Sequence, residues 1–260
     1  LMDPKFMYKA LFDVSAETIK ELSKDKKYLG AKIGFTSVLH TWGQNLSLHP
    51  HIHMIVPGGG IDSNGKWKNS KKKFFLPVKV VSKLFKGKFL SYTKKNFDQR
   101  KIKDKEQFQE IINSCYSKDW VVYTKKPMKS AKHVVKYLGR YTHRIAISNA
   151  RIKKYEDNKV TFSYKDYSDH NQIKEMTLDD TEFFRRYMMH VLPPNFMKIR
   201  HYGFLGNRNK EERIKAVRTA TNTKNPGPLL IDYEQIISDI LKRDVSICIK
   251  CGQKRHHKLE

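Results

Sequence analysis

The chain has 260 residues, of which 39% are hydrophobic and 12% aromatic, a composition that excludes a disordered chain and fits one large domain, or one plus a small appendage. Its 52 Lys and Arg outnumber its 26 Asp and Glu, and the resulting net charge of +26 predicts a nucleic-acid partner. No apolar run approaches the roughly 20 residues of a membrane span, and neither a secretory signal nor a basic amphipathic helix is found. We therefore expect no membrane partner.

Apolar periodicity and strand-forming composition predict the elements of the first half of the chain. Helices are predicted at residues 16–28, 80–97 and 105–116, and strands at 31–42, 51–59 and 120–127. Residues 43–50 connect the two early strands into an antiparallel hairpin, and a polar, lysine-rich excursion follows at 63–73. Ser130 fits the N-cap of a further helix over 130–143, which ends near Arg144.

The second half of the chain predicts a small β-meander followed by helices. Three alternating runs at 145–153, 159–165 and 172–177 form the meander, and helices are expected at 180–191 and 209–220. Pro226 and Pro228 mark a linker to a short terminal helix and a basic tail. The predicted fold class is α+β, with a central antiparallel sheet and helices packed against it. We expect a catalytic domain over 1–222 and an appendage over 223–260.

The three cysteines are too few for a disulfide framework, so a reducing cytoplasm is expected. Cys115 lies in a helical stretch and is interpreted as an inert core thiol. Cys248 and Cys251 have the C-x-x-C-G spacing of a zinc knuckle, which supplies two of four Zn²⁺ ligands. A complete zinc site would have to use His256 and His257 or a segment outside this chain.

Four histidines lie between residues 40 and 53. His51 and His53 are two apart on a predicted strand, so both imidazoles project from the same face, about 7 Å apart along the chain. Antiparallel pairing brings the preceding strand to the same level at His40, which is the favoured third ligand. This imidazole-rich set leaves coordination positions open, which is typical of a catalytic metal.

Other residues compete for the third ligand position. Gln44 in the connection is the reserve candidate, and His133 on the helix over 130–143 is another. His49 is a weaker candidate, because Pro50 interrupts the ladder beside it.

The nucleophile is predicted on the helix over 130–143. No Asp or Glu occurs between Phe35 and Pro57, so water activated by clustered carboxylates is less natural than a side-chain nucleophile. Tyr137 and Tyr141 are four apart and share one helix face. In the alternative interpretation, these tyrosines pack into a core as in any amphipathic helix. A basic stripe with the same spacing runs beside them: Lys136, Arg140 and Arg144.

These motifs together resemble a known family. His51-Ile52-His53 resembles the His-hydrophobe-His signature of the HUH endonuclease superfamily, and Tyr137 with Tyr141 resembles the paired nucleophile of its two-tyrosine branch. The chain is similar to two-tyrosine transposases of rolling-circle insertion sequences in four blocks: LHTWGQNLSLHPHIHMIVPGGG, YLGRYTHRIAISNARI, EFFRRYMMHVLPPNF and IRHYGFLGNR. The resemblance also implies a preceding zinc-binding segment, which we expect to be missing here.

The resemblance implies a mechanism. Two histidines and a third polar ligand hold Mg²⁺ or Mn²⁺ at the scissile phosphate of single-stranded DNA, and a tyrosine attacks to give a 5′-phosphotyrosine bond and a free 3′-hydroxyl. The second tyrosine permits strand transfer. Because no helicase motif is found, the host helicase or replication machinery would open the duplex, and a DNA-associated protein of the bacterial or archaeal cytoplasm is expected.

Basic and aromatic residues near the matching blocks are expected to contact DNA. The phosphate-binding candidates are Lys125, Lys126, Lys136, Arg140, Arg144, Arg185, Arg186, Arg200 and Arg208. The candidates for base stacking are Trp42, Tyr202 and Phe204. Two alternative functions stay open: a plasmid or phage replication or mobilisation nuclease of the same superfamily, and a catalytically idle DNA-binding relic.

Overall fold

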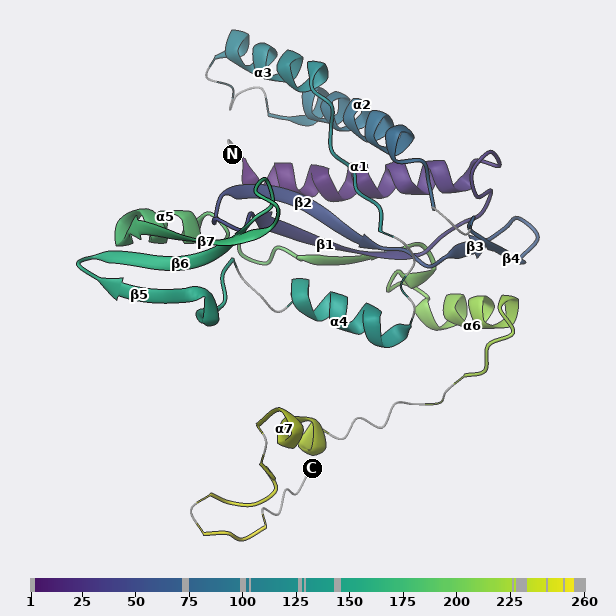
Figure 1. Ribbon diagram of the computed structural model, residues 1–260. Coiled ribbons are helices and arrows are strands. Elements are labelled where there is room, and N and C mark those ends of the chain that lie inside the picture. The colour runs from purple at the N-terminus through teal and green to yellow at the C-terminus, as the bar shows by residue number, and fades with distance from the viewer. Residues whose placement is uncertain are drawn as a thin grey trace. The chain divides into compact units, whose positions relative to one another are not determined.

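The computed structural model describes residues 3–71, 75–98, 102, 104–125, 128, 130–142, 146–225, 227, 233–241, 243–249 and 251–254 (Figure 1). The chain is an α+β protein with antiparallel sheets, as predicted. Its contacts divide it into two compact units, Leu1–Asn222 and Thr223–Glu260. Within the described residues, no helix combines the length and the apolar character that crossing a bilayer requires.

The central sheet has three antiparallel strands in the order β2-β1-β8. The strands β1 (Phe35–Trp42) and β2 (Leu48–Ile55) form the predicted hairpin. Its predicted bounds were wrong, because β1 begins later than residue 31, and β2 begins within the predicted connection 43–50 and ends before residue 59. The strand β8 (Ile199–Tyr202) pairs with the other edge of β1 and was not predicted. It was missed because a four-residue strand preceded by two prolines offers too short an alternation to recognise.

The helix α1 (Pro4–Lys24) lies on one face of this sheet, and α4 (Ala131–Thr142) lies on the other (Figure 1). The side chain of Asp3 caps α1 by accepting from the amide of Phe6 at 3.0 Å. The prediction of a helix over 16–28 was wrong at both ends, because the helix begins at Pro4 and ends at Lys24.

Burial on two sides explains why the first half of α1 was missed. Ala10 and Val14 belong to a cluster that α1 shares with α2 and α3, whereas Tyr8 and Phe12 pack against Leu39 of the sheet. A helix between two layers has no single apolar stripe, so its periodicity is weak.

The outer layer consists of α2 (Val78–Asn96) and α3 (Lys105–Ser117), both close to their predicted positions. The strand predicted at 120–127 was wrong, because the described residues 120–125 pair with no other strand. Trp120 instead packs against Phe85 and Phe89 of α2, with ring centroids 5.5 and 5.4 Å apart. β-branched and aromatic residues favour any half-buried surface, and the surface of a helix layer is one, so their presence here did not indicate a strand.

The predicted β-meander forms a second sheet, ordered β5-β6-β7. Its strands are β5 (Ile152–Glu156), β6 (Lys159–Asp166) and β7 (Gln172–Asp179), and the helix α5 (Asp180–Met188) follows. Within the run predicted at 145–153, Asn149–Arg151 form the short helix η2, so the first strand begins only at Ile152. We call residues 149–191 the arm, which extends to one side of the central sheet in Figure 1.

Smaller elements complete the first unit. A hairpin of β3 (Gly59–Ile61) and β4 (Trp67–Asn69) occupies part of the segment predicted as a polar excursion. The turn η3 (Gly203–Leu205) and the helix α6 (Lys210–Ala220) follow β8. The second unit contains α7 (Tyr233–Leu241), and the predicted linker prolines Pro226 and Pro228 lie outside the described residues.

Replacing Phe12 with alanine tests the packing of α1 on the sheet. Phe12 is 0% exposed, so Phe12→Ala should lower the free energy of unfolding by about 3–5 kcal/mol through lost burial and a residual cavity. Phe184→Ala removes a ring that is 60% exposed and should cost about 0.5 kcal/mol or less. Urea unfolding measures both values, and equal losses for the two variants would contradict this packing.

Candidate metal centre and tyrosine helix

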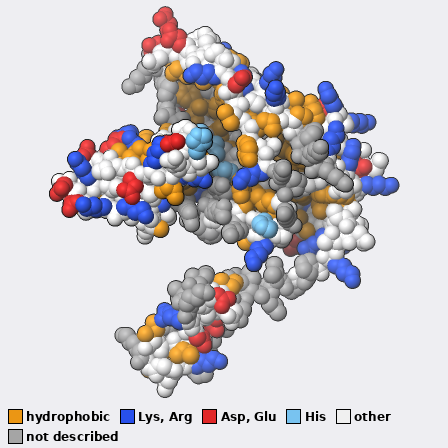
Figure 2. All heavy atoms as spheres, viewed as in Figure 1, with side chains coloured by type: hydrophobic (Ala, Val, Ile, Leu, Met, Phe, Trp, Pro, Cys, Tyr) orange, Lys and Arg blue, Asp and Glu red, His pale blue; other side chains and the backbone are white. Residues whose placement is uncertain are grey.

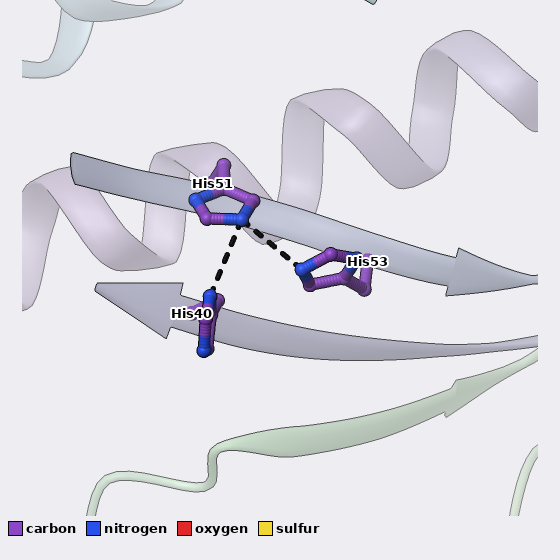
Figure 3. A group of neighbouring side chains, drawn as sticks. All are labelled: His40, His51 and His53. Carbon is purple, nitrogen blue, oxygen red and sulfur yellow. Dashed lines mark hydrogen bonds between the residues drawn. The ribbon is translucent and has the colours of Figure 1, made fainter. Parts of the chain in front are cut away.

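Three imidazoles converge on the face of the central sheet that lies opposite α1 (Figure 3). The strand register pairs His40 directly with His51, and His53 follows two residues later on the same face. The Nε2 atom of His51 lies 3.3 Å from Nδ1 of His40 and 3.0 Å from Nε2 of His53. The three ligand atoms all lie within 4.8 Å of one another, so this triad could hold a metal ion.

The bulge beside the triad orients His51. From His40 to Trp42 the first strand advances two residues, whereas from Leu48 to His51 the second advances three, and the register shifts there. Pro50, which has no amide hydrogen, lies in this bulge. The Nδ1 atom of His51 donates to the carbonyl of His49 at 2.7 Å, which leaves Nε2 with a lone pair that faces the other two histidines.

The distances and charge states of the triad fit metal binding. Two nitrogens bound at about 2.1 Å to one octahedral ion lie about 3.0 Å apart, close to the spacing seen here. Burial, with help from neighbouring imidazoles, lowers the pKa of His40 to about 3 and of His53 to about 4. Burial also lowers the pKa of His51. All three rings are therefore neutral near pH 7, the state that a metal ligand requires.

The other candidate ligands lie elsewhere. The amide of Gln44 donates to the hydroxyl of Tyr167 at 3.5 Å. His133 is exposed and bonds to the Ser130 hydroxyl at 2.8 Å, at the start of α4. His49 is exposed, and its carbonyl rather than its ring supports the triad.

The helix α4 brings Tyr137 to the triad. The hydroxyl of Tyr137 lies 2.9 Å from Nδ1 of His53, the ring nitrogen on the far side from His51. The ammonium of Lys125 stands 5.6 Å from the centroid of the Tyr137 ring. Tyr141 lies one turn further along α4, but its side chain is outside the described residues.

Three of the arginines expected at phosphates lie on or next to the helices α5 and α6. Arg185 is exposed and pairs with Glu182 at 2.6 Å. Arg186 also pairs with Glu182, at 2.7 Å, and additionally donates to the carbonyl of Asn45 at 3.3 Å. Arg208 is exposed beside α6.

Arg200 faces the interior of the first unit. Its guanidinium lies over the rings of Phe12 and Phe196, at 4.3 and 5.5 Å from their centroids, and 3.5 Å from the carboxylate of Asp13. The side chains of Lys136, Arg140, Arg144 and Lys126 lie outside the described residues.

The three aromatic candidates have different surroundings. Trp42 is half-buried, with its ring centroid 3.8 Å from that of His40 and the ammonium of Lys198 at 5.0 Å. Tyr202 stacks on Phe35 at 5.0 Å, and Phe204 is 8% exposed. Lys198 was not predicted as a site residue. Its ammonium lies close enough to His40 to disfavour a charged imidazole there. The one sequence signal for this residue is its position just before β8, a strand that was itself not predicted.

The cysteine pair in the second unit lies on a tight turn. The amide of Cys248 donates to the carbonyl of Gln253 at 2.8 Å, and the amide of Gly252 donates to the carbonyl of Cys248 at 2.9 Å. Neither Cys248 nor Cys251 is in a disulfide. His256 and His257 lie outside the described residues.

Comparisons with known proteins identify the family. Residues 34–213, which include the triad, α4 and the arm, match the model of a family described as "Putative transposase". The chain belongs to this transposase family. The predicted resemblance to transposases of insertion sequences is therefore confirmed.

Two curated relatives belong to bacteria. The chain is 40% identical over 261 residues to "Putative transposase y4qJ" of Sinorhizobium fredii, across 95% of this chain and 66% of that protein. It is 28% identical over 256 residues to "Transposase for insertion sequence element IS801" of Pseudomonas savastanoi pv. phaseolicola, across 96% of this chain and 62% of that protein. The chain therefore spans somewhat less than two thirds of each relative's length. No solved structure matches the chain.

Acidification should destabilise the metal-free protein. The unfolded chain takes up protons at the ordinary histidine pKa of 6.5, whereas the folded pKa values of His40 and His53 are about 3 and 4. The free energy of unfolding should therefore fall as the pH drops from about 6.5 towards 4, and be unaffected by these groups at higher pH. Urea unfolding across this range should show a shallower fall in His40→Gln, and an equally steep fall there would contradict this assignment.

Proposed function

We propose that this chain carries the catalytic centre of a transposase that cuts and rejoins single-stranded DNA through tyrosine. The observation that supports this most directly is the contact of the Tyr137 hydroxyl with His53, at 2.9 Å, beside a triad suited to a metal. The membership of the transposase family supports transposition as the use of this centre. A replication or mobilisation nuclease would use the same residues, but the family favours transposition, and an intact triad disfavours an idle relic.

His40, His51 and His53 would hold the metal ion. Of the two ions expected, Mn²⁺ fits three imidazole nitrogens better than Mg²⁺, which prefers oxygen ligands. When bound, the ion polarises a phosphate oxygen and offsets the negative charge that develops during displacement. The charge of +26 supports a DNA substrate, and the exposed cations Lys125, Arg185 and Arg208 are candidates for phosphate contacts.

The hydrogen bond between His53 and Tyr137 suggests how the phenol is activated. A neutral imidazole carries one proton, so when Nε2 of His53 serves as a ligand the proton lies on Nδ1. That N–H then donates to the Tyr137 oxygen, and a donor to the phenolate favours its ionised form. The Lys125 ammonium near the ring acts in the same direction. Such stabilisation is needed because an ordinary phenol, with a pKa of about 10, is almost fully protonated near pH 7.

The proposed reaction is an in-line displacement at phosphorus. The Tyr137 oxygen forms a bond to the phosphorus while the bond from phosphorus to the 3′-oxygen breaks. The products are a 5′-phosphotyrosine and a free 3′-hydroxyl; the phenol releases its proton to water, and the leaving 3′-oxygen takes one up from water. Tyr141, one turn along α4, would act on a second strand while the first link is held. Single-stranded DNA is the proposed substrate because one strand must reach both the triad and the tyrosine, and a host helicase would supply it.

The proposed chemistry predicts a covalent adduct. The full chain, incubated with Mn²⁺ and labelled single-stranded oligonucleotides carrying the ends of the parent element, should yield a protein-linked product that survives a denaturing gel and is removed by protease. Tyr137→Phe combined with Tyr141→Phe should reduce this product to background, because no phenol then faces the phosphate.

Tyr123 provides the matched control, since it is 78% exposed and lies outside α4. Tyr123→Phe should form the adduct at the wild-type rate. An adduct that persists in the double variant would refute the tyrosine mechanism, and one that forms equally well in His51→Ala plus His53→Ala would refute the role of the triad.

We also propose that Cys248 and Cys251 supply thiolates to a zinc ion, as their turn is suited to do. The purified full chain should then contain about one zinc ion, measured by elemental mass spectrometry, and Cys248→Ser should lose it. Cys115→Ser is the control, because that thiol packs against the cluster shared by α1, α2 and α3. A zinc content of zero in the wild-type protein would rule out a site that this chain completes by itself.

A further inference from the structure

The turn that joins the two metal-bearing strands is held by the arm. Three successive carbonyls of this turn, from Gln44, Asn45 and Leu46, each accept a hydrogen bond from a side chain of residues 149–191. Arg151 donates to Gln44. Arg186 donates to Asn45 at 3.3 Å, and Nε2 of His190 bonds to Leu46 at 3.2 Å. We call these three donors the turn clamp.

Leu46 anchors the same turn by packing. Its backbone adopts φ of 61°, in the left-handed region that favours glycine, yet its side chain is 0% exposed. That side chain belongs to the arm's own cluster, with Phe162 and Phe183 among its neighbours. A leucine in this conformation persists where its surroundings dictate it, so packing against the arm helps to fix the shape of the turn, together with the turn's own hydrogen bond from the amide of Gly43 to the carbonyl of Ser47 at 2.8 Å.

The donors of the turn clamp are themselves held in place. The guanidinium of Arg151 donates through Nε to the carbonyl of Ser163 at 2.7 Å and lies over the Phe162 ring. Arg186 is oriented by its ion pair with Glu182 at 2.7 Å. His190 is 2% exposed, so its ring has little freedom.

Both ends of the turn lead directly to metal ligands. On the first strand, the Trp42 ring is a neighbour of both the His40 and the His190 rings, with centroid distances of 3.8 and 6.1 Å. On the second strand, the bulge supplies the His49 carbonyl that accepts from Nδ1 of His51. A shift of the turn would therefore move the support of two of the three histidines.

We infer that Arg151, Arg186 and His190 are positioning residues for the metal triad, acting through the turn rather than on DNA. This inference rests on the proposed metal function, and it gives Arg186 a role different from the phosphate contact expected from the sequence. The arm then acts as the rigid outer support of the centre, since supporting partners of metal ligands set their orientation and affinity.

The neighbouring pair Arg185 and Arg186 offers a sharp test. Both guanidiniums bond to Glu182, but of the two only Arg186 is seen to reach the turn. Mn²⁺ binding to the full chain without DNA, followed by electron paramagnetic resonance, should weaken about 10-fold in Arg186→Met and stay unchanged in Arg185→Met. Circular dichroism and urea unfolding check that both variants are folded. Wild-type affinity in a folded Arg186→Met protein would overturn the inference.

A second variant and a metal-free measurement distinguish failure of the positioning role from failure of the proposed metal function. Arg186→Lys keeps the pair with Glu182, but its single amine does not span to Asn45, so it should also bind Mn²⁺ more weakly. Imidazole ¹⁵N spectra of the metal-free protein should show one fixed His51 tautomer in the wild-type chain and in Arg185→Met, and tautomer averaging in both Arg186 variants. If the wild-type chain binds no Mn²⁺, the metal function fails, and the His51 tautomer alone decides the positioning role.

Discussion

The antiparallel register between β1 and β2 is the constraint on which the candidate centre depends. It sets His40 opposite His51 and puts His53 on the same face, within reach of Tyr137 on α4. A slip of one residue would turn His51 and His53 towards α1 and bring apolar side chains to the tyrosine. The remaining layers of the first unit can be understood by how they hold this register.

Because side chains alternate along the hairpin, one face of the sheet is apolar and the other carries the imidazoles. Leu39 and Ile52, which are paired across the strands, face α1 and join the cluster around Phe12. Their neighbours on the other face are the imidazoles. Burial of the apolar face therefore fixes the polar one, and the arm holds the turn end of the hairpin, where the ladder carries its bulge. Figure 2 shows histidine side chains reaching the surface where the arm meets the rest of the unit.

The strongly basic composition does not by itself say which cations meet DNA. Arg200 lies over Phe12 and Phe196, and Arg151 is oriented by backbone carbonyls, so both contribute to internal structure. Arginine suits such places because its planar guanidinium stacks on rings and donates to several acceptors at once. Exposed cations such as Lys125 and Arg208 are better placed to attract a polyanion.

Much of this centre could be predicted from local pattern. The two-residue spacing of His51 and His53, the placement of His40 and the interruption of the ladder at Pro50 follow from strand alternation and proline chemistry, and each agrees with the observed register. The α+β class and the helix that carries Tyr137 were also predicted. The first half of α1, the strand β8 and the unpaired segment at 120–125 were not, because each depends on a partner distant in sequence.

The sequence by itself determined the residue types, the spacing that puts imidazoles on one face, and the family blocks in their order. The tertiary structure decided which side chains meet. It chose His40 over Gln44 and His133 as neighbour of the pair, set the Tyr137 hydroxyl against His53, and turned Arg186 and His190 towards the hairpin turn. The physical reason is that periodicity is a property of neighbouring residues, whereas the contacts of Tyr137, Arg186 and His190 join segments about 85 to 145 residues apart, whose meeting depends on the packing of the whole unit.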